Sequence, residues 1–207
     1  KFGGSSLADA GQFQKVRDIL LTDRRRAYVV PSAPGKRFGK DEKVTDMLYA
    51  MHRARKAGGD WQSIFARVQE RYQGIAADLG IATDLGAWLA QIGSDVEKGA
   101  SEDYCASRGE YLNGLLLSTY MGYRFIDPKD YIFFTAEGAF DSERTNTALS
   151  AALAEAEFAV IPGFYGSNPD GSIHTFSRGG SDITGAIVAR AAAADLYENW
   201  TDVNGFL

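Results

Sequence analysis

A lysine followed closely by two glycines and two serines opens the sequence. The segment Lys1–Ser6 reads KFGGSS and precedes a predicted helix. Paired glycines there let backbone N–H groups approach a phosphate, which a helix N-terminus also attracts, and Lys1 adds a mobile positive charge. The spacing is not that of a Walker sequence. The alternative is a plain strand-to-helix turn in which Ser5 or Ser6 caps the helix.

A second group of chemically capable residues lies near the other end of the chain. The segment Phe176–Asp182 reads FSRGGSD and stands just before another predicted helix. Arg178 could hold a carboxylate through two parallel N–H bonds, which a lysine cannot reproduce. The alternative is that Ser181 or Asp182 merely caps the helix.

An alternation of strands and helices must position these segments. Helical periodicity of apolar residues, broken by glycines, predicts helices over Asp9–Asp23, Val44–Lys56, Trp61–Leu79, Leu85–Lys98, Glu102–Met121, Thr145–Glu157 and Asp182–Ala194. Short apolar runs predict strands over Ala27–Ser32, Tyr123–Ile126, Tyr131–Thr135, Phe158–Ile161 and Leu196–Thr201. The segment Gly163–Gly171 is typical of a hairpin.

This alternation favours a mainly parallel sheet covered by helices on both faces, because parallel neighbours need crossover connections. In such sheets the ligand lies beyond the carboxyl ends of the strands. Four polar or glycine-rich segments are expected at that edge: Lys1–Ser6, Ser32–Thr45, Gly163–Asp182 and Thr201–Gly205.

The composition limits the possible partners. With 207 residues, 45% hydrophobic and 24% charged, the chain is typical of a single globular domain. A net charge of -5, from 27 acidic and 22 basic residues, argues against nucleic acid or anionic lipid as a partner. No apolar stretch is long enough to span a membrane. The single cysteine, Cys105, excludes an internal disulfide and fits a reducing cytoplasm.

The sequence offers little for a metal site or a catalytic histidine. His52 lies in a charged helical segment, and His174 lies in a predicted strand. Neither has a second ligand at metal spacing, so we expect both to be structural and predict no protein-bound metal.

Seven segments together resemble one known family. In chain order they read KFGGSS, VVPSAPGKR, KVTDML, SRGEYL, IPGFYGSNPDG, SRGGSD and WTDVNG. This order is similar to that of the aspartate kinases within the amino-acid kinase family, and the segments span nearly the whole chain.

The resemblance implies a fold and an activity. The fold would be the family's three-layer αβα sandwich, an α/β fold with a mainly parallel central sheet. The activity would be transfer of the γ-phosphoryl group of ATP, with Mg²⁺, to the side chain of L-aspartate, at the start of lysine, threonine and methionine synthesis. The protein is expected to be cytoplasmic and a homo-oligomer, without nucleic acid or membrane partners. Residues 1–207 would form a catalytic domain cut at both ends, without regulatory domains.

The resemblance also assigns roles to residues of this chain. Lys1 and Asp182 would be catalytic, with Asp182 orienting Lys1 toward the phosphates. The ATP-binding residues would be Lys1, Gly3, Gly4, Ser5, Thr201 and Asp202. The aspartate-binding residues would be Ser32, Thr45, Glu110, Arg178, Gly179, Gly180 and Ser181. The segment from Ser32 to Thr45 is longer than in many family members, so the match of Thr45 is the weakest of these.

Two other functions remain open from the sequence. The first is a kinase of the same fold that acts on glutamate or acetylglutamate. Glu110 argues against an acylated amine, which would leave its carboxylate unpaired. The second is an amino-acid sensor without turnover, which the retention of Lys1, Asp182, Thr201 and Asp202 disfavours.

Overall fold

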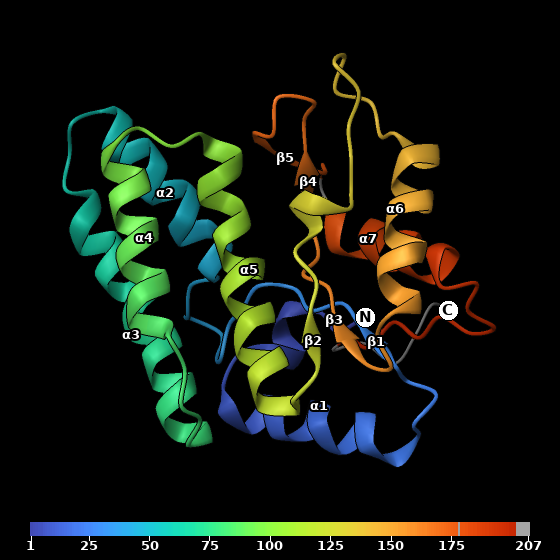
Figure 1. Cartoon of the computed structure of the whole chain (residues 1–207). Coiled ribbons are helices and arrows are strands. Elements are labelled where there is room, and N and C mark those ends of the chain that lie inside the picture. Colours follow the sequence, from blue (N-terminus) through green and yellow to red (C-terminus); the bar gives the residue numbers. More distant parts are fainter. Residues whose placement is uncertain (178, 202–207) are drawn as a thin grey trace.

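A parallel sheet lies between two layers of helices in the computed structural model, which describes residues 1–177 and 179–201 (Figure 1). Three short strands form its centre in the order β1-β3-β2, namely β1 (Tyr28–Val29), β3 (Ala159–Val160) and β2 (Arg124–Phe125). Parallel bridges join Phe2 to Pro31 on one side and to Trp200 on the other. The first residues of the chain therefore extend the sheet beyond β1.

Each face of the sheet carries its own apolar core, since side chains alternate between the two faces of a strand. Val29 and Val160 pack with one group of helices: α1 (Ala10–Thr22), α2 (Val44–Lys56), α3 (Trp61–Leu79), α4 (Leu85–Glu97) and α5 (Glu102–Met121). Val30 and Ile161 pack on the other face with α6 (Ser142–Ala154) and α7 (Gly180–Ala191). The αβα sandwich predicted from the sequence is thus confirmed (Figure 1).

The predicted helices are all present. The bounds of α2, α3 and α5 coincide with the predicted ones, and the remaining helices differ by up to three residues at their ends. Gly80 and Gly122 end α3 and α5 in the left-handed conformation, with φ of 64° and 69°. Such C-terminal glycines are a strong stop signal, which explains the accuracy of these ends.

The predicted hairpin is confirmed, whereas two other predicted strands are wrong in extent. β4 (Tyr165–Ser167) pairs with β5 (Ile173–Thr175) in antiparallel register. Tyr131–Thr135 contains only isolated bridges: Phe134 N–H donates to the Ser167 carbonyl of β4, while Phe133 N–H donates to the Thr145 hydroxyl. Leu196–Thr201 is reduced to the single bridge at Trp200.

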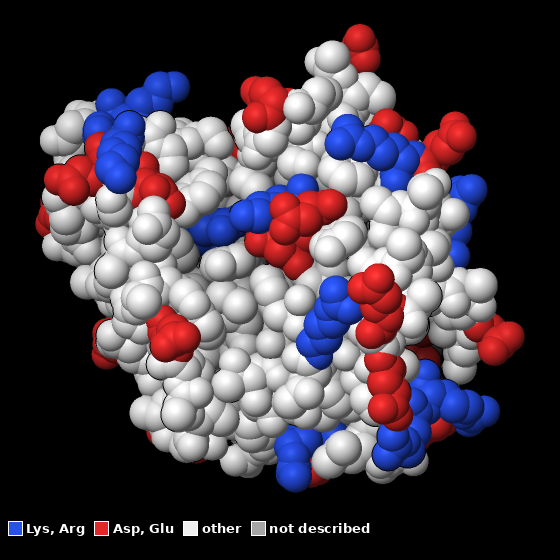
Figure 2. All heavy atoms as spheres, viewed as in Figure 1, with Lys and Arg blue, Asp and Glu red and all other residues white. Residues whose placement is uncertain are grey.

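Two short 3₁₀ turns complete the chain, η1 (Gly4–Leu7) and η2 (Pro128–Asp130). Cys105 is fully buried. Acidic and basic side chains are interspersed on the face seen in Figure 2, without a large patch of one sign. No helix among the described residues has the length and apolarity needed to cross a membrane.

Candidate active site at the carboxyl ends of the strands

The segments singled out in the sequence meet where the parallel strands end. Gly3 N–H donates to the Trp200 carbonyl at 2.9 Å, and Ser32 N–H donates to the Phe2 carbonyl at 3.1 Å. Gly163 N–H donates to the Pro31 carbonyl at 3.0 Å. These bonds continue the ladder of the sheet past its last paired residues, so the loops leave the sheet side by side.

Lys1 and Asp182 form an ion pair at this edge. The distance from Lys1 Nζ to Asp182 Oδ1 is 2.8 Å, and the Lys1 side chain is only 9% exposed. Asn199 Nδ2 donates to the same carboxylate oxygen at 3.0 Å. The lysine is therefore held in place by a carboxylate that is itself held by an amide. Sequence reasoning missed Asn199, which lies in no recognised segment.

The capping alternatives for both segments are wrong. α7 begins at Gly180 with Gly179 as its N-cap, and no side chain caps it, so Asp182 is free to bind Lys1. α1 is capped by Asp9, which accepts from Gln12 N–H. Ser5 lies instead within η1, whose N-cap has no side-chain hydrogen bond.

Two glycines from different loops are in direct backbone contact. Gly35 N–H donates to the Gly4 carbonyl at 2.8 Å. A Cβ on Gly4 would lie 2.7 Å from the Ala33 carbonyl, and a Cβ on Gly35 would lie 2.7 Å from Ser5 N. Only residues without a side chain allow this approach. The contact joins the loop of Lys1 to the loop of Ser32, which are the predicted phosphate and amino-acid segments.

Glu110 of α5 faces the second loop from inside the protein. Its carboxyl group accepts a hydrogen bond from the Ala33 backbone, while its Oε2 atom is buried without any partner. Burial raises the pKa of Glu110 to about 8, against an ordinary value of 4.5. A buried acceptor of this kind costs free energy unless a donor reaches it, so the site suits a cationic ligand group.

Asn113 lies one turn further along α5 and holds the same loop. Its Nδ2 donates to the Ser32 carbonyl at 2.6 Å, which fixes the orientation of the amide and leaves buried Oδ1 without a partner. Thr45 lies in the first turn of α2, whose first N–H, that of Val44, donates to the Pro34 carbonyl at 3.2 Å. Ser32 and Thr45 thus belong to one loop that is tied down at both ends.

The start of α7 packs tightly against the segment after β3. A Cβ on Gly163 would lie 2.5 Å from Ser181 Oγ, and a Cβ on Gly180 would lie 2.7 Å from a Phe164 ring carbon. Phe164 itself has a φ of 84°, which is strained for a residue with a side chain. Its N–H donates to the Thr184 hydroxyl of α7 at 3.0 Å. Backbone strain of this kind is often found at functional sites.

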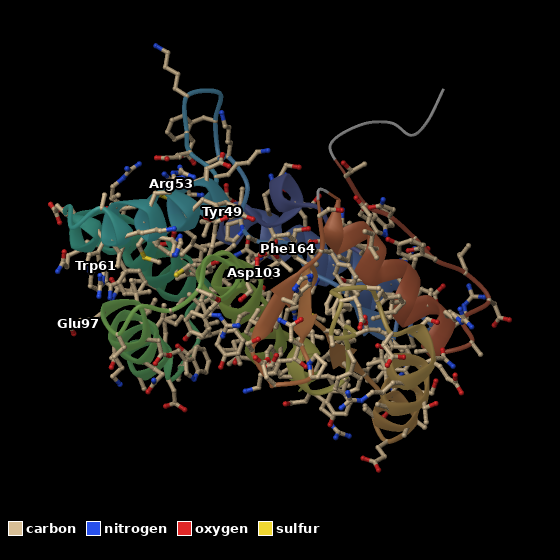
Figure 3. All side chains as sticks on the ribbon, turned by 90° about the horizontal axis from the view of Figure 1, so that it is seen from above. Tyr49, Arg53, Trp61, Glu97, Asp103 and Phe164 are labelled. Carbon is tan, nitrogen blue, oxygen red and sulfur yellow. The ribbon has the colours of Figure 1, made fainter. Side chains whose placement is uncertain are left out.

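Acidic side chains gather around Tyr49, near Glu110. The pKa of Tyr49 is raised by burial and by the charges of Glu102, Asp103 and Glu110. Tyr49, Asp103 and Phe164 lie in the middle of the molecule, whereas Trp61 and Glu97 lie at the far end of the helical layer (Figure 3). This negative surrounding favours a ligand that carries a cation.

Three predicted site residues remain to be placed: Thr201, Arg178 and Asp202. Thr201 lies beside Gly3, with its Oγ1 3.9 Å from the position of a Cβ there. Arg178 and Asp202 lie outside the described residues. A hollow of about 500 Å³ is lined by Lys1, by residues of α7 and by the segment that leads into β1, and Glu110 does not line it.

The described residues contain no group of three histidine, cysteine or carboxylate side chains that could hold a metal ion. His174 Nδ1 lies 3.8 Å from Asp103 Oδ2, and His52 Nδ1 lies 3.4 Å from Glu102 Oε2. Each imidazole thus lies near a single carboxylate, an arrangement that fits the structural roles expected for both.

Comparison with known proteins gives a consistent result. The profile of the amino acid kinase family matches residues 1–207. Aspartokinase 3 of Bacillus subtilis is 37% identical over 99% of this chain, which corresponds to 48% of its own length. The crystal structure of Clostridium acetobutylicum aspartate kinase is 48% identical with a TM-score of 0.97, and it matches 100% of this chain and 48% of that one.

Two crystal structures of Escherichia coli aspartokinase III share the fold at greater sequence distance. The complex with aspartate and ADP is 24% identical with a TM-score of 0.84, over 99% of this chain and 48% of that one. The complex with lysine and aspartate is 25% identical with a TM-score of 0.85, over 99% and 49%. The present chain therefore spans about half the length of these relatives.

Proposed function

The chain belongs to the amino acid kinase family, and on that premise we propose that the whole protein is an aspartate kinase. It would transfer the γ-phosphoryl group of ATP to the β-carboxylate of L-aspartate and give 4-phospho-L-aspartate, the first step toward lysine, threonine and methionine. The Bacillus subtilis and Clostridium acetobutylicum relatives are named for this activity, and aspartate is bound in both Escherichia coli structures. We place this chain within the catalytic domain of that enzyme.

The observation that carries the proposal is the buried Glu110 carboxyl with an unpartnered oxygen. This carboxyl projects from α5 against Ala33 of the Ser32 loop, and that loop contacts the glycine loop of Lys1 through Gly4 and Gly35. An ammonium group would supply the missing donor and place the rest of an amino acid close to the phosphate segment. An acylated amine carries no positive charge to stabilise the ionised form of this buried carboxyl, which disfavours an acetylglutamate kinase.

The chemistry requires no general base. A β-carboxylate has an ordinary pKa near 3.9 and is already ionised at neutral pH. What remains is to bring two anions together and to stabilise the charge on the transferred phosphoryl group. Lys1 would perform this stabilisation, held by Asp182 and Asn199, with the glycine loop of Gly3 and Gly4 beside it. The Gly3 N–H already donates to the Trp200 carbonyl, so Gly3 would contribute the close approach of its backbone rather than a free donor.

The donor in this proposal is ATP with Mg²⁺. Mg²⁺ prefers oxygen ligands and is commonly bound through substrate phosphates, so it would be held largely by phosphate oxygens, and there it would neutralise phosphate charge. Thr201, which lies beside Gly3, and Asp202 would complete the nucleotide contacts. A cytoplasmic location and a homo-oligomeric state stay predictions of the sequence.

An acyl-phosphate assay on the full-length protein tests this function. We expect ATP-dependent product, trapped as a hydroxamate, with a kcat/KM for aspartate at least about a hundredfold above that for N-acetylglutamate, because the latter lacks the ammonium donor. A preference for glutamate would assign the protein to another kinase of the family. Aspartate binding without any acyl phosphate would favour a sensor, against which the ion pair of nearly buried Lys1 with Asp182 argues, since a sensor needs no phosphate contact.

Arg178→Lys tests how the α-carboxylate is recognised. The lysine keeps the charge but loses the forked donor, and a hydrogen bond to a charged group is worth roughly 1.5–3 kcal/mol. We therefore expect kcat/KM for aspartate to fall by at least about tenfold. The Kd for ATP, measured by calorimetry, should stay unchanged. Loss of ATP binding with an unchanged KM for aspartate would mean that the two halves of the site are assigned the wrong way round.

A further inference from the structure

An arginine outside the recognised segments is buried behind the site. Arg71 belongs to α3, in the helical layer, and its side chain is only 4% exposed. Arginine is seldom buried unless its donors are satisfied, because removing a guanidinium from water is costly. The partners of Arg71 therefore indicate why the sequence places a cation there.

Arg71 binds three separate segments at once. Its Nη1 atom donates to the Gly35 carbonyl at 3.1 Å and, more weakly, to the Ala8 carbonyl at 3.4 Å. Its Nη2 atom donates to Asp41 Oδ2 at 2.6 Å and to the Glu42 carbonyl at 3.3 Å. Ala8 directly follows η1, Gly35 follows Ser32, and Glu42 leads into α2 and Thr45. One planar guanidinium thus joins the ends of both loops of the site.

The Asp41 carboxylate is kept in its charged form by two neighbouring arginines. Its side chain is 8% exposed and is shared by Arg71 and Arg37, whose Nε lies 2.8 Å from Oδ2. Hydrogen bonds from Arg37 and the charge of Arg71 hold the pKa of Asp41 well below its usual range. The pair is therefore ionised throughout the physiological range, and the loop from Gly35 to Glu42 is anchored to α3.

Gly35, which Arg71 binds through its carbonyl, also contacts the phosphate segment. Gly35 donates to the Gly4 carbonyl, and its Cα is packed against the backbone of Gly4 and Ser5. A shift of Gly35 must therefore move the glycine loop beside Lys1, or open the contact between the loops. Ser32 and Thr45, on either side of Gly35, would shift with it.

We propose that Arg71 is a positioning residue, which sets the distance between the phosphate loop and the amino-acid loop without touching either substrate. This inference rests on the proposed function for its kinetic consequences. The coupling of the two loops through one buried guanidinium does not depend on that function. A small change in the distance between the phosphate and the acceptor carboxylate is enough to slow phosphoryl transfer.

Arg71→Lys in the full-length protein tests the inference, with Arg67→Lys as the matched control. Arg67 lies one turn earlier on α3 and forms an exposed ion pair with the Glu42 side chain. Lysine at position 71 keeps the charge but cannot reach Asp41 and both carbonyls together. We expect kcat to fall by about ten- to hundredfold with a smaller rise in KM for either substrate. Asp41→Asn should reproduce the pattern, and the control should match the parent protein.

Hydrogen exchange gives a readout that does not depend on turnover. Arg71→Lys should increase exchange in residues 3–7 and 33–42 together, although these segments are distant in sequence. A lower Tm with unchanged kcat and unchanged exchange in residues 3–7 would show that Arg71 only stabilises the fold and would overturn the proposal. If the parent protein phosphorylates no amino acid, the proposed function fails, while the exchange result still decides the coupling of the loops.

Discussion

Lys1→Met in the intact protein should lower kcat by about a thousandfold or more, while aspartate still binds. The ammonium of Lys1 is nearly buried and lies 2.8 Å from Asp182, so its charge acts in a poorly hydrated place. Its interaction with the phosphoryl group grows as charge develops in the transition state, and such an interaction contributes to kcat rather than to substrate binding. Methionine keeps the length of the side chain without the charge.

The measurement is steady-state kinetics together with calorimetric titration of aspartate. Lys15→Met, on the exposed side of α1, serves as a control for the loss of one positive charge. We expect the control to retain the parent kcat. Near-normal turnover by Lys1→Met would remove Lys1 from catalysis, and an equal loss in both variants would indicate an effect of net charge.

Glu110→Gln should weaken aspartate binding and remove its pH dependence, which is the second large effect that we expect. In the empty site the pKa of Glu110 is about 8, because burial disfavours the charged form. An arriving ammonium favours the ionised carboxylate, so binding must release a proton whenever the solution is below pH 8. The apparent affinity for aspartate should therefore rise between pH 6 and pH 8, approaching tenfold per pH unit at the lower end.

Glutamine cannot ionise, so the variant should lose this pH dependence and bind aspartate more weakly at pH 8. It should also discriminate less against N-acetylaspartate, because a neutral amide does not demand a cationic partner. Calorimetry in two buffers of different ionisation enthalpy counts the released protons directly. Glu97→Gln, at the far end of the helical layer (Figure 3), is the matched control. The same pH profile in Glu110→Gln would assign the titration to another group.

The same carboxyl should affect the stability of the ligand-free protein. Its pKa rises from 4.5 in the unfolded chain to about 8 in the folded one, so folding favours the protonated form. The free energy of unfolding should accordingly fall as the pH rises from 4.5 to 8, and Glu110→Gln should remove that part of the decrease. The site thus lowers stability at neutral pH, and the bound ammonium restores it.

Much of the fold could be predicted because its signals are local. The helices α2, α3 and α5 show apolar residues at helical spacing and are bounded by glycines, so their extents follow from the sequence. The segment Tyr131–Thr135 has the residues of a strand as well, yet its pairing with β4 is limited to one bridge at Ser167, and its Phe133 N–H donates to a hydroxyl on α6. Whether an apolar run pairs depends on tertiary contacts that composition does not record.

The candidate site was predictable only where its residues lie in recognisable segments. Lys1 and Asp182 were paired by resemblance, and the structure brings them into contact. Asn199 and Asn113, which hold Asp182 and the Ser32 loop, stand in no motif and became visible only through their hydrogen bonds. Arg71 looks in the sequence like one more charged residue of a surface helix, although it is buried.

The Lys1–Asp182 pair also has a consequence for how the protein is made. Its members stand near opposite ends of the described chain, and Phe2 pairs both with Pro31, which is synthesised early, and with Trp200, which is synthesised late. At roughly 5–20 residues per second, a ribosome needs on the order of ten seconds or more between the lysine and its carboxylate. During that interval the nascent chain can assemble its first loop contacts but has no anchored lysine. The Lys1 ammonium therefore obtains its carboxylate partner only when translation of this segment is almost finished.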